Sequence, residues 1–356
     1  MSTALIPVPL PPVPVSLPRT RRPHAFRSFE AVHDEVHMRD SLKISDLVLP
    51  LSALQMTATG GIEVPGIGVL ALTPWSQGQL ARMLGIRWDR WFQASLVSTE
   101  ERADEVNRRL SRQGDAWMIR SRLKLPSEDV TGVGVLRAFV SPEYQTLDDR
   151  RLFDRLAGVL GPRASEFRFA RVEHTDRSSH FVAVDGAEID LGDGTPDPHR
   201  GGFLLRNSEV GGGAASIVEY LFRQVCTNGL VVPIGSGAPL FYRHHRKTSD
   251  ESIDRALAYG FSQLPARITA ATDQIREARM DYVPEPEARL AEILSLRPDL
   301  RHLTDAAVAA WNQEPEPTRF GLLQALTLAA QGLDPDGRAE LESFAATALL
   351  SPVLVH

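Results

Sequence analysis

Residues 200–247 constrain the fold of this chain more than any other stretch, because extended and helical signals alternate there over a short distance. A strand-like run over residues 203–210 ends at three consecutive glycines, at positions 211–213. The apolar residues that follow recur at steps of three and four, which is the spacing of one helix face. The pattern therefore predicts a strand, a glycine loop and an amphipathic helix over residues 214–226.

The second half of this stretch returns to extended structure and ends in positive charge. Asn228 and Gly229 end the predicted helix, since both residues accept the left-handed conformation found at helix ends. Two extended runs follow, at residues 230–232 and 240–242. The second leads directly into a basic cluster that consists of Arg243, His244, His245, Arg246 and Lys247.

Composition limits the class of protein. The chain has 356 residues and carries a formal charge of -6. Its length and its hydrophobic fraction of 43% are enough for one large or two modest hydrophobic cores. Its single cysteine, Cys226, excludes an intramolecular disulfide framework and a cysteine-rich zinc site, and fits a reducing compartment. No run approaches the roughly 18 apolar residues of a membrane span. We therefore expect a cytoplasmic protein without membrane contact.

The order of the patterns predicts an α+β fold in three parts. Residues 1–28 form a Pro-rich and then basic leader, which is either a disordered tail or an arm that touches a partner. Residues 29–248 are expected to form the α+β core, a small, mostly antiparallel, curved sheet packed by helices. Residues 249–356 carry only helical patterns and an excess of acidic side chains, with Pro265 as an expected break in the first helix.

Individual elements of the core have local signals. Thr73 and Pro74 are typical of a helix start, and residues 99–113 form a polar helix that is acidic first and basic last. Further strands and helices are expected at residues 67–72, 88–96, 117–125, 133–140, 147–160, 167–172 and 181–184.

The strand at residues 117–125 has a cationic face. Its side chains alternate, which places Arg120, Arg122 and Lys124 on one side of the sheet. Together with the basic cluster at 243–247, such a strand is able to hold a nucleic-acid backbone in a groove, with aromatic side chains such as Tyr144, Phe241 or Tyr242 stacking on bases. The competing interpretation is a solvated cationic surface.

Four segments carry a resemblance. The runs GVLRAFVSPEYQTLDD, RNSEVGGG, LFRQVCTNGLVV and RHHRK are similar to a phage/plasmid-like protein family of unknown function. The matching positions within residues 65–280 are Asn207, Ser208, Gly211, Arg223, Val225, Cys226, Asn228, Gly229, Arg243 and either His244 or His245. The resemblance implies a mobile-element protein and no established activity. A looser likeness, at the level of the fold alone, is to single-strand annealing recombinases.

Catalytic chemistry is weakly indicated. The three glycines before the predicted helix fit either a phosphate held at a helix N-terminus or an ordinary tight turn. Cys226 is expected in the core rather than as a nucleophile, because it lies on an apolar helix face. His174, His180, His244 and His245 could bind a metal together, but no HxH or HExxH spacing supports this, so we predict no metal, no cofactor and no catalytic residue.

We therefore expect a non-enzymatic DNA-binding protein that binds or anneals single-stranded DNA in mobile-element recombination or maintenance, and that forms a homo-oligomer. The alternative is a protein interaction or assembly module without a nucleic-acid role. An enzyme that acts on nucleic acid is a third possibility, with Asp185, Asp190, His174 and His180 as its candidates. The predicted nucleic-acid contacts are Arg120, Arg122, Lys124, Arg137, Arg206, Gly211, Gly212, Gly213, Arg243, His244, His245, Arg246 and Lys247.

Overall fold

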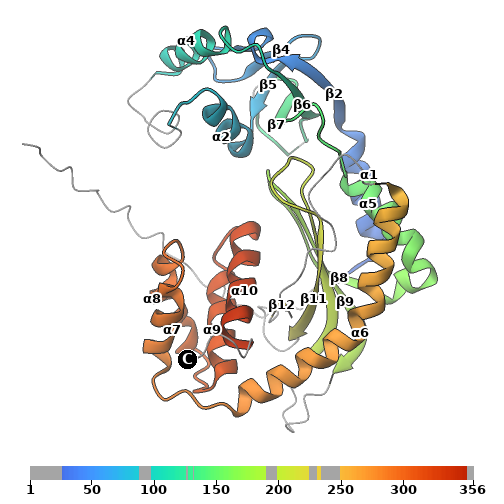
Figure 1. The fold of residues 1–356 in the computed structure, drawn as a ribbon, viewed down its shortest axis with the longest axis vertical. Coiled ribbons are helices and arrows are strands. Elements are labelled where there is room, and N and C mark those ends of the chain that lie inside the picture. Colours follow the sequence, from blue (N-terminus) through green and yellow to red (C-terminus); the bar gives the residue numbers. More distant parts are fainter. Residues whose placement is uncertain are drawn as a thin grey trace, which may run out of the picture.

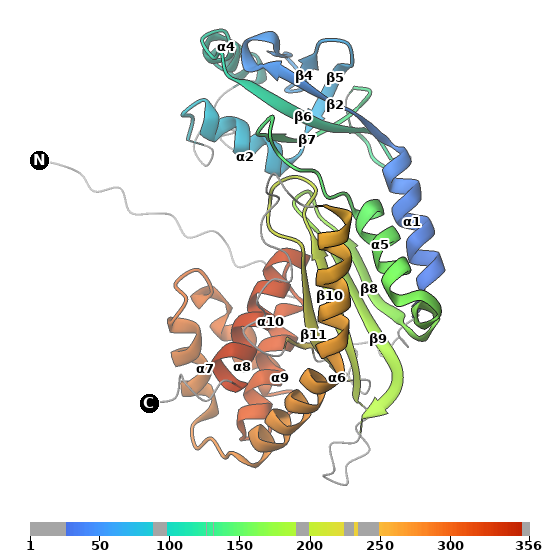
Figure 2. The same cartoon turned by 45° about the vertical axis from the view of Figure 1, so that its right-hand side comes forward.

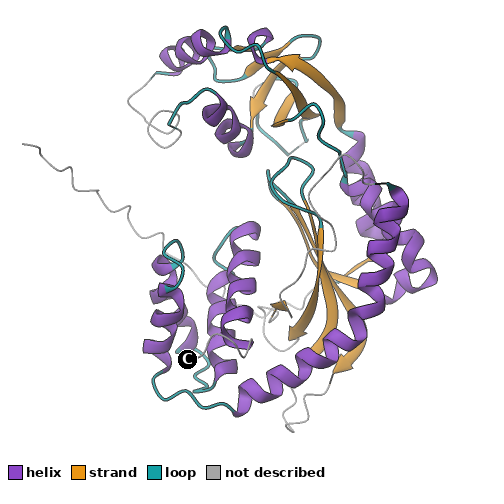
Figure 3. Cartoon of the chain, viewed as in Figure 1, coloured by secondary structure: helices purple, strands orange, loops and turns teal. Residues whose placement is uncertain are grey.

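The chain contains two six-stranded sheets and an all-helical C-terminal region (Figure 1). The computed structural model describes residues 26–87, 98–125, 127–130, 132–189, 199–223, 231–233 and 249–350. Among the described residues, the named strands all precede residue 250, and the named elements after it are helices, as Figure 3 shows. The predicted α+β class is confirmed, although the core holds two sheets rather than one.

The N-terminal sheet is antiparallel except where β5 pairs with β7. Its order is β2-β6-β7-β5-β4-β3. The strands are β2 (Lys43–Pro50), β3 (Gln55–Met56), β4 (Ile62–Val64), β5 (Gly68–Leu72), β6 (Ala116–Leu123) and β7 (Gly134–Val140), with a 3-10 turn at Leu51–Ala53. Helices α2 (Pro74–Met83) and α4 (Thr99–Leu110) bury Leu80 and Leu110 in one core with Leu70 and Leu136 of the sheet.

Both helices of this part begin as the sequence predicts. The Thr73 hydroxyl accepts a hydrogen bond from the backbone N–H of Ser76, and Pro74 occupies the first helical position. Ser98 and Glu101 form a reciprocal capping box at the start of α4. Such caps are local signals, which explains why the sequence locates these helix starts. The helix expected around residues 88–96 lies outside the described residues.

The central sheet is antiparallel throughout, in the order β1-β8-β9-β10-β11-β12. Its strands are β1 (Arg27–Ser28), β8 (Arg168–His174), β9 (Ser179–Ile189), β10 (His199–Asn207), β11 (Ser216–Arg223) and β12 (Val231–Pro233). Each of the strands β8 to β11 pairs with the next along the chain, so short turns place polar residues at the end of the sheet that faces the N-terminal sheet (Figure 2).

The helix predicted over residues 214–226 is wrong, because residues 216–223 form strand β11. Ile217 and Leu221 are buried on one face of the sheet, and Tyr220 is buried on the other. A strand that is buried on both faces has an almost continuous apolar run, and such a run also satisfies helical spacing. The β-branched and aromatic residues of SIVEYLFR are the signal that favours a strand.

One face of the central sheet is covered by α1 (Phe29–Ser41), α5 (Asp149–Leu160) and α6 (Asp250–Met280), with a 3-10 turn at Gly161–Glu166 after α5. Phe153, Phe169 and Phe181 pack there with ring centroids 4.5 to 6.0 Å apart. Gly201 of β10 admits the side chain of Ile268 of α6, since a Cβ at residue 201 would lie 2.6 Å from that side chain. Helix α6 is unbroken at Pro265, so the predicted break is wrong.

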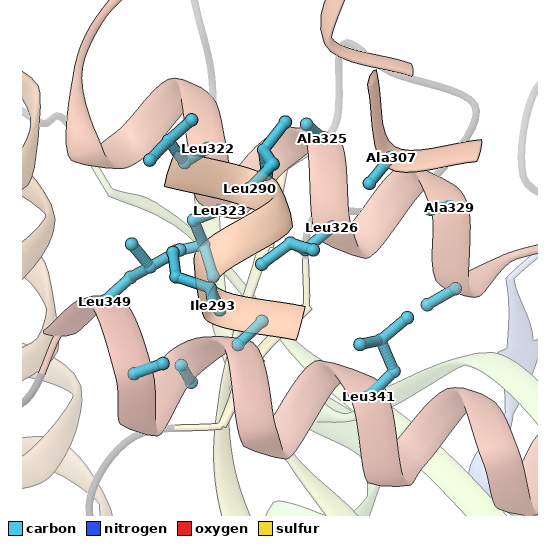
Figure 4. Close-up of a cluster of buried hydrophobic side chains, with 14 of the residues drawn as sticks. Leu290, Ile293, Ala307, Leu322, Leu323, Ala325, Leu326, Ala329, Leu341 and Leu349 are labelled. Atoms are coloured by element: carbon cyan, nitrogen blue, oxygen red, sulfur yellow. The ribbon is translucent and has the colours of Figure 1, made fainter. Parts of the chain in front are cut away.

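The C-terminal helices pack around a core of their own, shown in Figure 4. They are α7 (Pro286–Ser295), α8 (Thr304–Trp311), α9 (Arg319–Ala330) and α10 (Pro335–Leu350), with a 3-10 turn at Arg301–Leu303. Leu290 of α7, Leu326 of α9 and Leu341 of α10 are fully buried in it. The boundary predicted near residue 248 stays a prediction, although α6 joins the cores on both sides of it.

Candidate anion-binding site between the two sheets

A small polar cavity lies where the two sheets meet α1 and α5. Its volume is about 30 Å³, which is room for one or two water-sized groups. Four basic and three acidic side chains line it together with His174 and Ser179. The lining residues are Val36, Arg39, Asp40, Leu42, Lys43, Arg122, Leu125, Arg137, Asp149, His174, Thr175, Ser179 and Glu209.

Glu209 is the buried anchor of the cavity. It follows β10 in the turn to β11 and is 5% exposed. Its carboxylate accepts hydrogen bonds from Lys43 Nζ at 2.8 Å, from the backbone N–H of Asp149 at 2.8 Å, and from Arg137. Although burial works in the opposite direction, the charges of Arg137 and Lys43 hold the pKa of Glu209 well below its usual range. Glu209 therefore stays ionised and joins the two sheets.

Asp149, the first residue of α5, is a second buried carboxylate beside Glu209. Its Oδ1 accepts from Asn207 Nδ2 at 2.8 Å, and its Oδ2 accepts from Ser179 Oγ at 2.5 Å. Burial and the charge of Glu209 raise the pKa of Asp149 to about 6. The pKa values of the two neighbouring carboxyl groups thus differ widely, so that Glu209 stays ionised while Asp149 is able to take a proton in weak acid.

A histidine extends this polar chain toward α1. His174 Nδ1 lies 2.8 Å from Ser179 Oγ, and its Nε2 lies 3.4 Å from Glu35 Oε1. The hydrogen bond with His174, assisted by Arg27, lowers the pKa of Glu35 to about 2. His174 was a candidate ligand or catalyst in the sequence; its Nδ1 hydrogen-bonds to Ser179, and its Nε2 lies at ion-pair distance from Glu35.

Three arginines from different elements converge on the cavity: Arg39 of α1, Arg122 of β6 and Arg137 of β7. Arg122 pairs with Glu128, and Arg137 pairs with Glu209. Within the described part of the chain, no carboxylate lies at ion-pair distance from the Arg39 guanidinium. Burial lowers the pKa of Arg39, and the charges of Arg122 and Arg137 lower it further, against the opposing charges of Glu35 and Asp149. Like charges gathered around a cavity favour an anion in it.

The family comparison covers the part of this site that lies C-terminal to residue 136. The sequence model of a family described as a domain of unknown function, DUF932, matches residues 137–329. This chain belongs to the DUF932 family. No curated protein and no solved structure matches the chain. The DUF932 match includes Arg137, Asp149, His174 and Glu209, whereas Arg39, Lys43 and Arg122 precede it. The predicted link to phages and plasmids stays a prediction.

The helices of this DUF932 protein were also compared with the requirements of a membrane span. No helix among the described elements combines the length and the apolar character that crossing a bilayer requires.

The predicted nucleic-acid contacts of the DUF932 chain separate into several places. Arg122 and Arg137 line the cavity, and Lys124 is exposed just beyond the end of β6. Arg120 does not belong to a cationic surface, because it is 4% exposed and pairs with Asp148 at 2.8 Å. It also donates a hydrogen bond to the Glu209 carbonyl. The predicted cationic face of this strand is therefore partly an internal ion-pair network.

Arg206 and Gly212 line a second and larger pocket, of about 600 Å³, between β10, β11 and α10 of the DUF932 chain. Arg206 pairs there with Asp336 at 3.0 Å. Arg177, from the turn between β8 and β9, lines the same pocket and lies 5.0 Å above the ring of Trp75. Thr175 of the same turn lines the small cavity and donates a hydrogen bond to Asp336, so this turn joins the two pockets.

The glycines at 211–213 do not open a helix, which corrects the predicted phosphate loop. They form the turn between β10 and β11, with Gly211 at φ 76°. The Gly212 N–H donates to Ser208 Oγ at 2.7 Å, so this N–H is not available to a phosphate. Arg243, His244, His245, Arg246 and Lys247 lie outside the described residues, as do Cys226, Asn228 and the loop that begins at Asp190.

Sequence reasoning missed Arg39, Lys43, Asp149 and Glu209. Glu209 carried the clearest signal, since it is a charged residue between the apolar run of β10 and the glycine turn, next to the Asn-Ser pair of the family motif. Asn207 of that pair is fully buried and also donates to the Leu147 carbonyl at 2.8 Å. The motif thus supports the buried carboxylates rather than a surface turn.

Proposed function

We propose that this DUF932 protein binds single-stranded DNA without catalysing a reaction. Its arginine cluster, which consists of Arg39, Arg122 and Arg137, contacts the phosphates in this proposal. The observation that carries it is the Arg39 guanidinium, which has no carboxylate at ion-pair distance among the residues that the structure describes and lines the cavity with two further guanidinium groups. A phosphate oxygen supplies the missing counter-charge, and arginine is well suited to bind it.

The size of the cavity supports contact with the backbone rather than capture of a free nucleotide. A volume of about 30 Å³ admits phosphate oxygens but not a base or a sugar. Lys124 is exposed at the end of the same strand as Arg122. Arg177 and Arg297 line the second pocket, on the other side of the turn between β8 and β9. A polyanion that crosses this turn meets basic side chains at both pockets, and Phe344 in the larger pocket offers an aromatic ring to a base.

Salt dependence of binding is the first test. We expect a fluorescein-labelled oligo-dT of about 20 nucleotides to bind, with an affinity that falls as NaCl rises from about 50 to 200 mM. Three phosphate contacts on a single strand predict a slope of about -2 in a plot of log K against log salt. Fluorescence anisotropy measures both quantities. Absence of binding at low salt, or binding that salt leaves unchanged, would contradict the proposal.

A second candidate function is a protein interaction or assembly module without a nucleic-acid role. The observation that favours it is a set of apolar side chains in the helical region, Tyr259, Met280, Tyr282 and Leu296, each more than half exposed. Light scattering coupled to size-exclusion chromatography separates the candidates. A discrete oligomer with an absorbance ratio free of nucleic acid, and with no oligonucleotide binding, favours the assembly module.

A further inference from the structure

Two histidines and an aspartate converge on the outer side of α1 and α5. His33 and His37 are four residues apart on α1, so their side chains lie on one face of that helix. Both reach across to Asp154 of α5, which is separated from them by more than a hundred residues of sequence. His33 Nε2 lies 3.0 Å from Asp154 Oδ1, and His37 Nε2 lies 2.8 Å from the same oxygen.

We propose that His33, His37 and Asp154 form a binding site for a divalent transition-metal ion, with zinc as the preferred ion. Imidazole nitrogen and carboxylate oxygen are zinc ligands, and two histidines on adjacent turns of a helix are a common way to present them. The three ligand atoms lie within 4.8 Å of one another. This site is separate from the arginine cluster and does not rest on DNA binding.

The separations of the two histidine nitrogens from Asp154 Oδ1 suit a shared ion. A zinc ion lies about 2.0–2.2 Å from each nitrogen or oxygen ligand, so two ligands of one ion lie roughly 2.9–3.4 Å apart at angles between 90° and 109°. The observed separations of 2.8 and 3.0 Å are close to the short end of that range. The ion thus needs only a small outward shift of the aspartate to take the place of the two hydrogen bonds.

The surroundings orient the ligands and leave room for water. The His33 ring stacks on Phe29 with centroids 6.2 Å apart, and the two imidazole centroids are 4.3 Å apart. The three side chains are 29%, 35% and 42% exposed, so solvent molecules are able to complete the coordination. Arg150 Nε lies 3.7 Å from Asp154 Oδ2, which leaves Oδ1 for the ion but places a positive charge nearby. An accessible three-ligand site of this kind exchanges its ion readily and links α1 to α5.

Isothermal titration of the untagged, chelator-treated full chain with zinc chloride tests the proposal. We expect one binding event, and a loss of affinity of at least about a hundredfold in His33→Ala and His37→Ala, since each variant removes a direct ligand. His302→Ala is the matched control, because His302 is exposed in the turn before α8. This variant is expected to bind zinc as tightly as the wild type does. Binding at equal strength in all four proteins would overturn the site.

Two further readouts keep the proposal testable if a variant folds poorly. Cobalt chloride, added in place of zinc, is expected to give visible d–d absorption bands in the wild type and not in Asp154→Asn, which keeps the size of the side chain. Zinc is also expected to raise the melting temperature of the wild type and leave that of Asp154→Asn unchanged. A wild-type protein that shows neither bands nor a shift holds only a hydrogen-bonded trio, and the proposal fails.

Discussion

Replacing Glu209 by alanine will lower the free energy of unfolding by about 3–5 kcal/mol, because it removes one partner from a buried ion-pair network. Lys43, Arg137 and the backbone N–H of Asp149 all donate to this carboxylate and lose this acceptor in the variant, although Lys43 keeps its pairs with Asp40 and Asp148. Urea denaturation followed by circular dichroism measures the change. Glu209→Gln keeps the shape of the side chain but loses its charge, so its free energy of unfolding is expected to lie between those of the wild type and Glu209→Ala.

Glu128→Ala is the matched control for this prediction. Glu128 also pairs with a cavity arginine, Arg122, but its side chain is 27% exposed. Water screens that pair, so its removal is expected to cost about 1 kcal/mol or less. Equal costs for the alanine variants of Glu209 and Glu128 would show that Glu209 does not act as a buried anchor.

The stability of the protein will depend on pH through Asp149 in a direction opposite to that of an ordinary paired carboxylate. The pKa of Asp149 is raised from 3.8 to about 6, first by burial and then by the charge of Glu209. The folded state therefore binds this proton more tightly than the unfolded state does. The resulting stabilisation is fully present below about pH 4 and is lost as the pH rises through about 6.

Comparison with Asp149→Asn isolates this effect from all other titrating groups. Two pKa units correspond to about 3 kcal/mol. We expect the unfolding free energy of the wild type, relative to that of the variant, to fall by about this amount between pH 4 and pH 7. Denaturation curves of both proteins at several pH values measure the difference. A difference that stays constant with pH would show that Asp149 is not a strained buried carboxyl group.

The sequence predicts those elements whose signals are local. Helix α2 follows from its Thr73 cap and Pro74, and β6 follows from strict alternation of its side chains. Strand β11 could not be predicted in this way, because both of its faces are buried and its apolar run therefore lacks the alternation that indicates a strand. The unbroken α6 shows the same limit, since packing of Phe261 and Leu264 in the core offsets the local preference of Pro265.

The candidate site was predictable only in part, for a similar reason. Alternation along β6 brings Arg122 to attention, but Glu209 lies 166 residues from its partner Lys43. Only the tertiary fold reveals that such residues meet. The same alternation also assigned Arg120 to the surface, because sequence gives the face of a strand but not what covers it. Asp148 and the Glu209 carbonyl cover Arg120 from elements that local patterns do not connect to it.

The affinity of Arg39→Ala for single-stranded oligo-dT tests the central claim most directly. Arg39 lacks a carboxylate partner within the described residues, so its removal is expected to leave the melting temperature unchanged or slightly raised. Arg108→Ala is the matched control, since Arg108 is 49% exposed on α4 and does not line the cavity. At about 50 mM NaCl we expect Arg39→Ala to bind about tenfold more weakly than wild type, with a salt slope smaller by about 0.7, and Arg108→Ala to bind as wild type does. Equal affinity and equal salt slope for wild type and both variants would contradict a phosphate contact at the arginine cluster.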